Sequence, residues 1–228
     1  MVKPADDETQ AQLAEIGCNG VDPMPNHDTP LLICDVDEVV LHLVDPFVEV
    51  LKERGYDLKS HSFKLTGNVF HRETGREATQ EEVWAGLDQL FSEQSVRQQV
   101  VTGAVDALNS LSGEIEIIYL TNMPHAYRDH RIGHLNSHGL QHKLITNSGS
   151  KVDAIRQLTA SRSAKVGFVD DTPLNLSQVR EHVDSVNLFH FMANDTFRNM
   201  VSPIDGVHIS TGCWTEASNC IRDQLLVS

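Results

Sequence analysis

Short apolar runs alternate with segments of helical periodicity through the chain after Gly103. The apolar runs predict four strands, at Ile115–Leu120, Val166–Val169, Val186–Phe191 and Val207–Ile209. The other segments predict helices, at Val105–Leu111, Ala126–Ser137, Lys151–Leu158, Pro173–Val183 and Thr215–Leu226. Strands that alternate with helices are typical of βαβ units, so this region predicts a three-layer α/β fold with a Rossmann-like parallel sheet.

The chain before Asp45 has two further patterns. Leu31–Cys34 is continuously apolar, as parallel strands covered on both faces tend to be, and it predicts the first buried strand. Residues 1–29 combine several prolines with polar side chains. They predict an N-terminal extension with one short helix at Glu8–Glu15 and no catalytic role.

Between residues 45 and 97 the regular alternation is interrupted. Pro46–Arg54 predicts a helix, and Ser60–Thr79, rich in β-formers and turn residues, predicts a short hairpin. Thr79 and Glu82 form a capping-box pattern that opens a helix running through Leu90. We therefore expect a core made of residues 30–44 and 98–228, with a small cap inserted at 45–97.

Composition narrows the class of protein. The 228 residues, 40% of them hydrophobic, are enough for one large domain or one domain with a small insert. The net charge of −14 argues against nucleic acid or an anionic membrane as partner, because both need a positive surface. The polar first ten residues do not resemble a signal peptide, and the scattered cysteines suggest neither a disulfide framework nor a zinc site. A cytoplasmic protein is expected.

Two aspartates, Asp35 and Asp37, follow the first predicted strand directly. Open α/β sheets bind ligands at the carboxyl edge of their strands, and such a pair can divide the work between a nucleophile and a proton donor. Asp-x-Asp also occurs in solvated turns, so the pair alone does not establish a site. An acidic protein that handles an anionic substrate needs a local positive field, which a divalent cation supplies.

Three further groups fall at the same predicted edge. Thr121 and Asn122 end one strand, and the pair Asp170-Asp171 ends another. Lys151 begins a helix, where free N–H groups already favour anions. Lys143 and Lys165 are alternatives to Lys151, which we prefer because of its position after the loop at 147–150. If the sheet is parallel, all these groups converge.

The order and spacing of these four motifs resemble the haloacid dehalogenase superfamily over residues 31–183. The resemblance implies that Asp35 attacks phosphorus to form an aspartyl-phosphate, and that Asp37 first protonates the leaving oxygen and then deprotonates water. It implies magnesium (Mg²⁺) between Asp35, the backbone carbonyl of Asp37 and the Asp170-Asp171 pair, with Asp171 as the direct ligand. Thr121, Asn122 and Lys151 would bind the phosphoryl group.

An aspartate at position 37 favours phosphate esters over dehalogenation, because expulsion of a halide needs no acid there. We therefore expect a Mg²⁺-dependent phosphatase acting on a small phosphorylated metabolite. A phosphotransferase or mutase with the same intermediate, and a non-catalytic protein that binds a phosphorylated ligand, remain alternatives. Glu38 departs from the superfamily pattern, which often has a small residue there; its carboxylate could face solvent, reach the metal or repel an anionic substrate.

Three weaker features could have either a functional role or an ordinary structural one. His130, His134 and His138 share a helix face, which fits a transition-metal site or, better, a partly packed helix. His125 follows the Thr121 motif and could approach the substrate. The cap cations could steer a phosphorylated substrate or be ordinary solvated charges: Lys52, Arg54, Lys59, Lys64, Arg72 and Arg76. The oligomeric state stays open.

Overall fold

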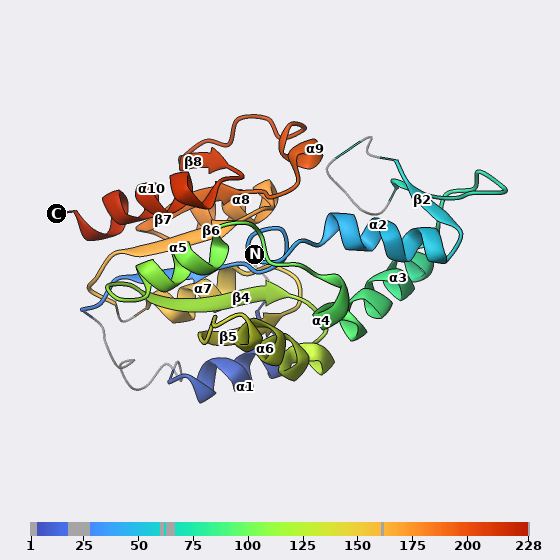
Figure 1. Cartoon of the computed structure of the whole chain (residues 1–228). Coiled ribbons are helices and arrows are strands. Elements are labelled where there is room, and N and C mark those ends of the chain that lie inside the picture. The colour runs from blue at the N-terminus through green and yellow to red at the C-terminus, as the bar shows by residue number, and fades with distance from the viewer. Residues whose placement is uncertain (1–3, 18–27, 60–61, 63–66, 161, 228) are drawn as a thin grey trace.

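A sheet of six parallel strands forms the centre of the protein (Figure 1). The computed structural model describes residues 4–17, 28–59, 62, 67–160 and 162–227. Along the sheet the strands are β5 (Lys143–Asn147), β4 (Glu116–Asn122), β1 (Leu31–Cys34), β6 (Val166–Asp170), β7 (Val186–Phe191) and β8 (Val207–Thr211). The predicted three-layer α/β fold is confirmed, and the direction of strand addition reverses at β1.

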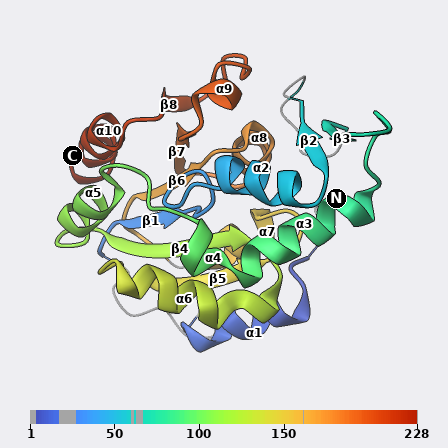
Figure 2. The same cartoon turned by 45° about the vertical axis from the view of Figure 1, so that its right-hand side comes forward.

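Helices cover both faces of the sheet (Figure 2). One face carries α5 (Ala104–Leu111), α6 (Arg128–Ser137) and α10 (Trp214–Leu226). The opposite face carries α1 (Asp7–Glu15), α7 (Val152–Thr159) and α8 (Pro173–His182). Helix α1, predicted within the N-terminal extension, packs against β5 and α7 and buries Leu13 completely.

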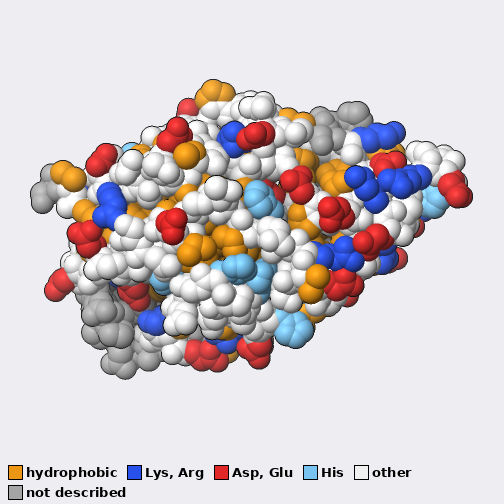
Figure 3. Space-filling model, in the orientation of Figure 1, with side chains coloured by type: hydrophobic (Ala, Val, Ile, Leu, Met, Phe, Trp, Pro, Cys, Tyr) orange, Lys and Arg blue, Asp and Glu red, His pale blue; other side chains and the backbone are white. Residues whose placement is uncertain are grey.

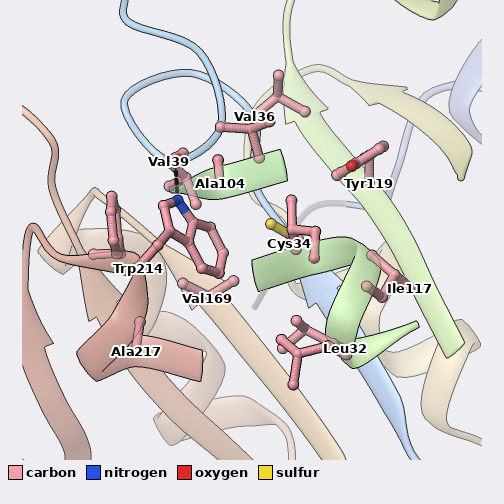
Figure 4. Close-up of a cluster of buried hydrophobic side chains, with 14 of the residues drawn as sticks. Leu32, Cys34, Val36, Val39, Ala104, Ile117, Tyr119, Val169, Trp214 and Ala217 are labelled. Atoms are coloured by element: carbon pink, nitrogen blue, oxygen red, sulfur yellow. Dashed lines mark hydrogen bonds between the residues drawn. The ribbon is translucent and has the colours of Figure 1, made fainter. Parts of the chain in front are cut away.

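The apolar run of β1 is explained by this double cover. Leu32 and Cys34 lie in the hydrophobic cluster under α5 and α10, while Leu31 and Ile33 lie in the cluster under α7 and α8. Successive side chains of a strand point to opposite faces, so a strand covered twice must be apolar at every position. In the first cluster the buried Trp214 indole donates from Nε1 to the Val39 carbonyl at 2.9 Å (Figure 4).

The small inserted cap leaves the core after β1 and returns before α5. It contains α2 (Val44–Glu53), β2 (Tyr56–Leu58), β3 (Val69–His71), α3 (Gln80–Ser92) and α4 (Gln94–Arg97). Its hydrophobic core is separate from the two core clusters and centres on Phe47, Leu51, Leu87 and Phe91. Helix α3 begins with the predicted capping box between Thr79 and Glu82.

Several elements differ from the sequence-based prediction. The hairpin pairs β2 with β3, so its first strand precedes the predicted range; residues 60–61 and 63–66 lie outside the described residues. The sequence analysis missed β5, whose only strongly apolar residues are Leu144 and Ile145, and the four-residue helices α4 and α9 (Asp195–Arg198). The remaining predicted strands and helices are present within a few residues. Within the described part of the chain, no helix is long and apolar enough to cross a membrane.

Candidate active site

The sequence-predicted site residues meet at the carboxyl edge of the three central strands. Asp35 follows β1, Thr121 and Asn122 end β4, and Asp170 ends β6. The backbone N–H of Asp35 donates to the carbonyl of Val169 at 2.9 Å, which extends the β1–β6 pairing to the first aspartate. Because strand addition reverses at β1, this is the place where doubly wound sheets bind ligands.

The side chain of Lys151 joins two of these strand ends. Its Nζ lies 2.9 Å from Oδ1 of Asp35 and 2.8 Å from Oδ2 of Asp170, and all three residues are buried. Burial lowers the pKa of Lys151, but the two carboxylates outweigh it and raise that pKa above its usual value. Burial raises the pKa of Asp35 to about 7, although the Lys151 ammonium opposes the shift. Lys151 is therefore a fixed positive charge beside Asp35.

The other two candidate lysines lie elsewhere. Lys143 is ion-paired with Glu116 at 3.5 Å on the exposed edge of the sheet. Lys165 donates to the carbonyl of Val227 near the C-terminus. Neither lines the pocket that contains Asp35.

Three carboxylates form a group suited to a hard cation. Asp35, Asp170 and Asp171 each offer an oxygen, and these oxygens lie within 4.8 Å of one another. Oxygen-only donors of this kind fit Mg²⁺, which keeps several waters and takes few protein carboxylates. Burial, reinforced by Asp170 and Asp35, raises the pKa of Asp171 well above its usual value. The residues present fit the ion.

Asp170 and Asp171 differ in how far they are committed to protein partners. Asp170 is fully buried and accepts hydrogen bonds from the backbone N–H of Thr172 at 2.8 Å and from Nδ2 of Asn175 at 3.0 Å, besides its ion pair with Lys151. Asp171 is partly exposed, lines the pocket and accepts from the Thr172 hydroxyl at 3.0 Å. Asp171 therefore has more freedom to bind a ligand from the pocket.

Asp37 is held by residues that the sequence analysis did not single out. Its Oδ1 accepts from Nε2 of Gln98 at 2.8 Å and from Nη1 of Arg131 at 3.0 Å. Its Oδ2 lies 3.5 Å from the hydroxyl of Thr121. Arg131 is completely buried on α6 and also donates to the side chains of Gln94 and Gln98. The predicted proton donor thus sits in a buried polar network.

Glu38 has a structural role, and although it lines the pocket, its burial rules out the solvent-facing orientation considered from sequence. Its buried carboxylate accepts the backbone N–H groups of Leu43, Val44 and Asn194 at 2.6–2.9 Å. Burial raises the pKa of Glu38, and these N–H groups oppose that shift. The backbone of Glu38 has φ +60°, the left-handed conformation that favours glycine. The carboxylate joins the start of the cap to the loop after β7.

Thr121 and Asn122 both line the pocket, in different ways. Thr121 is buried, with its hydroxyl toward Asp37. The side chain of Asn122 accepts from Nδ2 of Asn147 and donates to the carbonyl of Gly149, both at 2.8 Å. Asn122 therefore fixes the loop between β5 and α7, which leads to Lys151.

The histidines considered in the sequence analysis are not part of this site. The three-carboxylate group is the only cluster of three or more His, Cys, Asp or Glu residues with metal-binding geometry in the described part of the chain, so the series on α6 forms none. His125 contacts the Thr146 hydroxyl at 2.6 Å and Asp6 at 3.1 Å, so it holds the start of α1 instead of facing the substrate.

A pocket of about 300 Å³ opens between these strand ends and the cap. Its core side contains Asp35, Asp37, Thr121, Lys151 and Asp171. Its opposite side comes from the cap and from the loop after β7. A volume of this size matches a small ligand.

Solved structures with the same fold were found, although no model of a known protein family and no curated protein matches the sequence. A haloacid dehalogenase-like hydrolase family protein from Streptococcus pneumoniae aligns with a TM-score of 0.56 at 13% identity, over 85% of this chain and 98% of that chain. A haloacid dehalogenase family hydrolase from Deinococcus radiodurans, solved with bound phosphate and sodium, aligns with a TM-score of 0.57 at 11% identity, over 85% and 95%. A family IA hydrolase from Entamoeba histolytica aligns with a TM-score of 0.57 at 14% identity, over 85% of this chain and 99% of that chain. The chain therefore has the haloacid dehalogenase-like fold that its four sequence motifs resemble.

Proposed function

We propose that this protein is a Mg²⁺-dependent phosphatase that hydrolyses a small phosphomonoester through an aspartyl-phosphate on Asp35. The observation that carries the proposal is the position of Lys151, whose ammonium joins Asp35 and Asp170 at the bottom of the pocket. Phosphoryl transfer depends mainly on positioning and on positive charge around the transferring group. A nucleophile, a fixed cation and three clustered carboxylates meet both needs in one place.

In the first step an oxygen of Asp35 attacks phosphorus and the ester P–O bond breaks. Asp37 gives a proton to the leaving oxygen, and Oδ2 is suited to this because Oδ1 is occupied by Gln98 and Arg131. In the second step Asp37 takes a proton from water, which attacks the same phosphorus and releases inorganic phosphate from Asp35. Thr121 and Lys151 hold the phosphoryl oxygens in both steps.

Asp35, the carbonyl of Asp37 and Asp171 would hold the magnesium ion, with Asp170 orienting Lys151. The ion supplies positive charge to the phosphoryl oxygens. Asp170 is the better orienting residue of the pair because its two oxygens already accept from Thr172, Asn175 and Lys151.

Phosphate release from p-nitrophenyl phosphate and a panel of phosphorylated metabolites, with Mg²⁺ and with EDTA, tests the proposal. We expect turnover that requires the metal and is lost in Asp35→Asn. Asp205→Asn is the matched control, because Asp205 is exposed and outside the pocket. Transfer to an added alcohol that outcompetes hydrolysis would identify a phosphotransferase. Tight binding of phosphorylated ligands without product would contradict catalysis.

A further inference from the structure

The cap side of the pocket is built from apolar side chains. Val44 lies at the start of α2, Trp84 and Leu87 lie on α3, and Phe91 lies near the end of α3. Met192, in the loop after β7, and Phe197, on α9, complete this apolar wall of the pocket. Trp84 is 52% exposed and lines the pocket. The polar lining residues come from the strand ends and the loops after them.

The pocket has little positive charge to offer beyond the phosphoryl site. Among the described residues that line it, Lys151 is the one cation, and Asp35 and Asp170 already balance it. Glu38 and Asp171 add negative charge, while Asp37 is ion-paired with Arg131. A second anionic group on the substrate, such as a carboxylate or another phosphate, would therefore be repelled without a counter-charge.

Three of the described cations of the cap contact other cap residues, and Lys64 lies outside the described residues. Arg72 pairs with Asp57 at 2.9 Å, Arg76 with Glu82 at 2.8 Å, and Lys59 lies over the ring of Phe70. Figure 3 shows blue side chains beside red ones at the end of the molecule that carries β2. This arrangement supports the interpretation of the cap cations as ordinary surface charges.

The same wall discriminates against hydroxyl groups. A hydroxyl moved from water onto an apolar surface loses its hydrogen bonds, which costs free energy unless new partners replace them. An apolar group gains instead from leaving water. A cavity of about 300 Å³ leaves room for one aromatic ring or a short alkyl chain beside the phosphoryl group.

We infer that the substrate is a phosphomonoester whose organic part is apolar and uncharged, an aryl or short alkyl group that packs against Trp84 and Leu87. This inference rests on the proposed function and names its substrate class. Sugar phosphates and phosphorylated carboxylic acids are then poor substrates of the same site.

A series of alkyl phosphates tests the inference, because their alcohols are similar leaving groups and differ mainly in apolar area. From methyl to butyl to hexyl phosphate we expect kcat/KM to rise about threefold per methylene until the wall is covered. The kcat/KM values for glycerol 3-phosphate and phosphoglycolate should be lower than the value for butyl phosphate by about tenfold or more. Equal or higher kcat/KM for the polar esters would overturn the inference.

Variants on the wall sharpen the test. Trp84→Ala should flatten the dependence of kcat/KM on chain length, so that the ratio of kcat/KM for hexyl phosphate to that for methyl phosphate falls toward one. Trp84→Arg should raise kcat/KM for phosphoglycolate relative to kcat/KM for butyl phosphate. Val96→Ala is the control, because Val96 is 80% exposed on α4 and does not line this pocket. A chain-length dependence that survives in Trp84→Ala and Leu87→Asn would contradict this placement of the organic group.

Calorimetric titration with alkylphosphonates in the presence of Mg²⁺ separates the inference from the proposed function. These ligands keep the anionic phosphorus group but have no ester bond to break. Binding that tightens with chain length in a protein that turns over no ester would support the inference and contradict the phosphatase. Turnover with a preference for charged or hydroxylated esters would support the phosphatase and contradict the inference about its substrate. Absence of hexylphosphonate binding would overturn the inference directly.

Discussion

Nη1 of Arg131 lies 3.0 Å from Oδ1 of Asp37, and Arg131 itself is completely buried. The pair joins α6 to the loop after β1, residues 94 positions apart in the chain. Without its carboxylate partner, the buried arginine would keep a charge that water cannot reach. This pair therefore links the stability of the core to the position of the proposed proton donor.

Replacement of Arg131 should destabilise the folded protein. We expect Arg131→Met to lower the free energy of unfolding by about 3–5 kcal/mol, with a smaller loss when Asp37→Asn is already present. Urea unfolding of the two single variants and the double variant measures the coupling. Arg222→Met is the control, because Arg222 pairs with Glu114 at the surface and should lose less than about 1 kcal/mol. Additive losses at Arg131 and Asp37 would show that the pair contributes nothing.

Replacement of Asp37 should affect poor leaving groups most. The proposed mechanism uses Asp37 to protonate the leaving oxygen, which an alkoxide needs and p-nitrophenolate does not. We expect Asp37→Asn to reduce kcat for an alkyl phosphate by about 10²–10⁴-fold and for p-nitrophenyl phosphate much less in the first step. Single-turnover kinetics on both esters measure that step alone. Equal losses on the two esters would argue against proton donation by Asp37.

Glu38 offers a test of backbone strain against hydrogen bonding. Glu38→Gly relieves the φ of +60° by about 1 kcal/mol but leaves three backbone N–H groups without their acceptor, each worth about 1–3 kcal/mol. We expect a net destabilisation of about 2 kcal/mol or more in urea unfolding. Ser185→Gly is the matched control, because Ser185 has the same φ and is exposed. The free energy of unfolding of Ser185→Gly should be unchanged or higher. A higher free energy of unfolding for Glu38→Gly would show that the carboxylate is dispensable.

His134 should make stability depend on pH. Burial, together with Arg131 and His138, lowers its pKa from 6.5 to about 4. A lowered pKa means that the unfolded chain binds the proton first, so this contribution is present above about pH 6.5 and is lost as the pH falls toward 4. Compared with His134→Gln, the unaltered protein should lose about 3 kcal/mol more between about pH 7 and pH 4. His208→Gln, at an exposed position on β8, should not change that loss. Parallel pH curves for the original protein and His134→Gln would contradict the prediction.

The sequence could predict that the strand ends of the candidate site lie together, because their positions follow from topology alone. Once Leu31–Cys34 and Val166–Val169 are parallel neighbours, the aspartates that follow them must lie together. The lysine was predictable for a related reason, since it begins a helix that starts at the same edge.

The network around Asp37 was not predictable in this way. Gln94 and Gln98 lie at the end of the cap and Arg131 lies within a helix rich in histidines, so no local pattern connects them. Their contact depends on how the cap returns to the core, which is a tertiary relationship. The buried Glu38 was similarly hidden, because its partners are backbone groups, and these carry no sequence signal.

Residues 37 and 38 are each tied to a different chain segment that joins the core to the cap. Asp37 bonds to Gln98 in the returning segment, and Glu38 bonds to Leu43 and Val44 in the outgoing one. Both segments that connect the cap to the core are thus hydrogen-bonded to the two residues Asp37 and Glu38, close to Asp35 in the chain. A rotation of the cap relative to the core would therefore strain the hydrogen bonds that hold the side chains of Asp37 and Glu38.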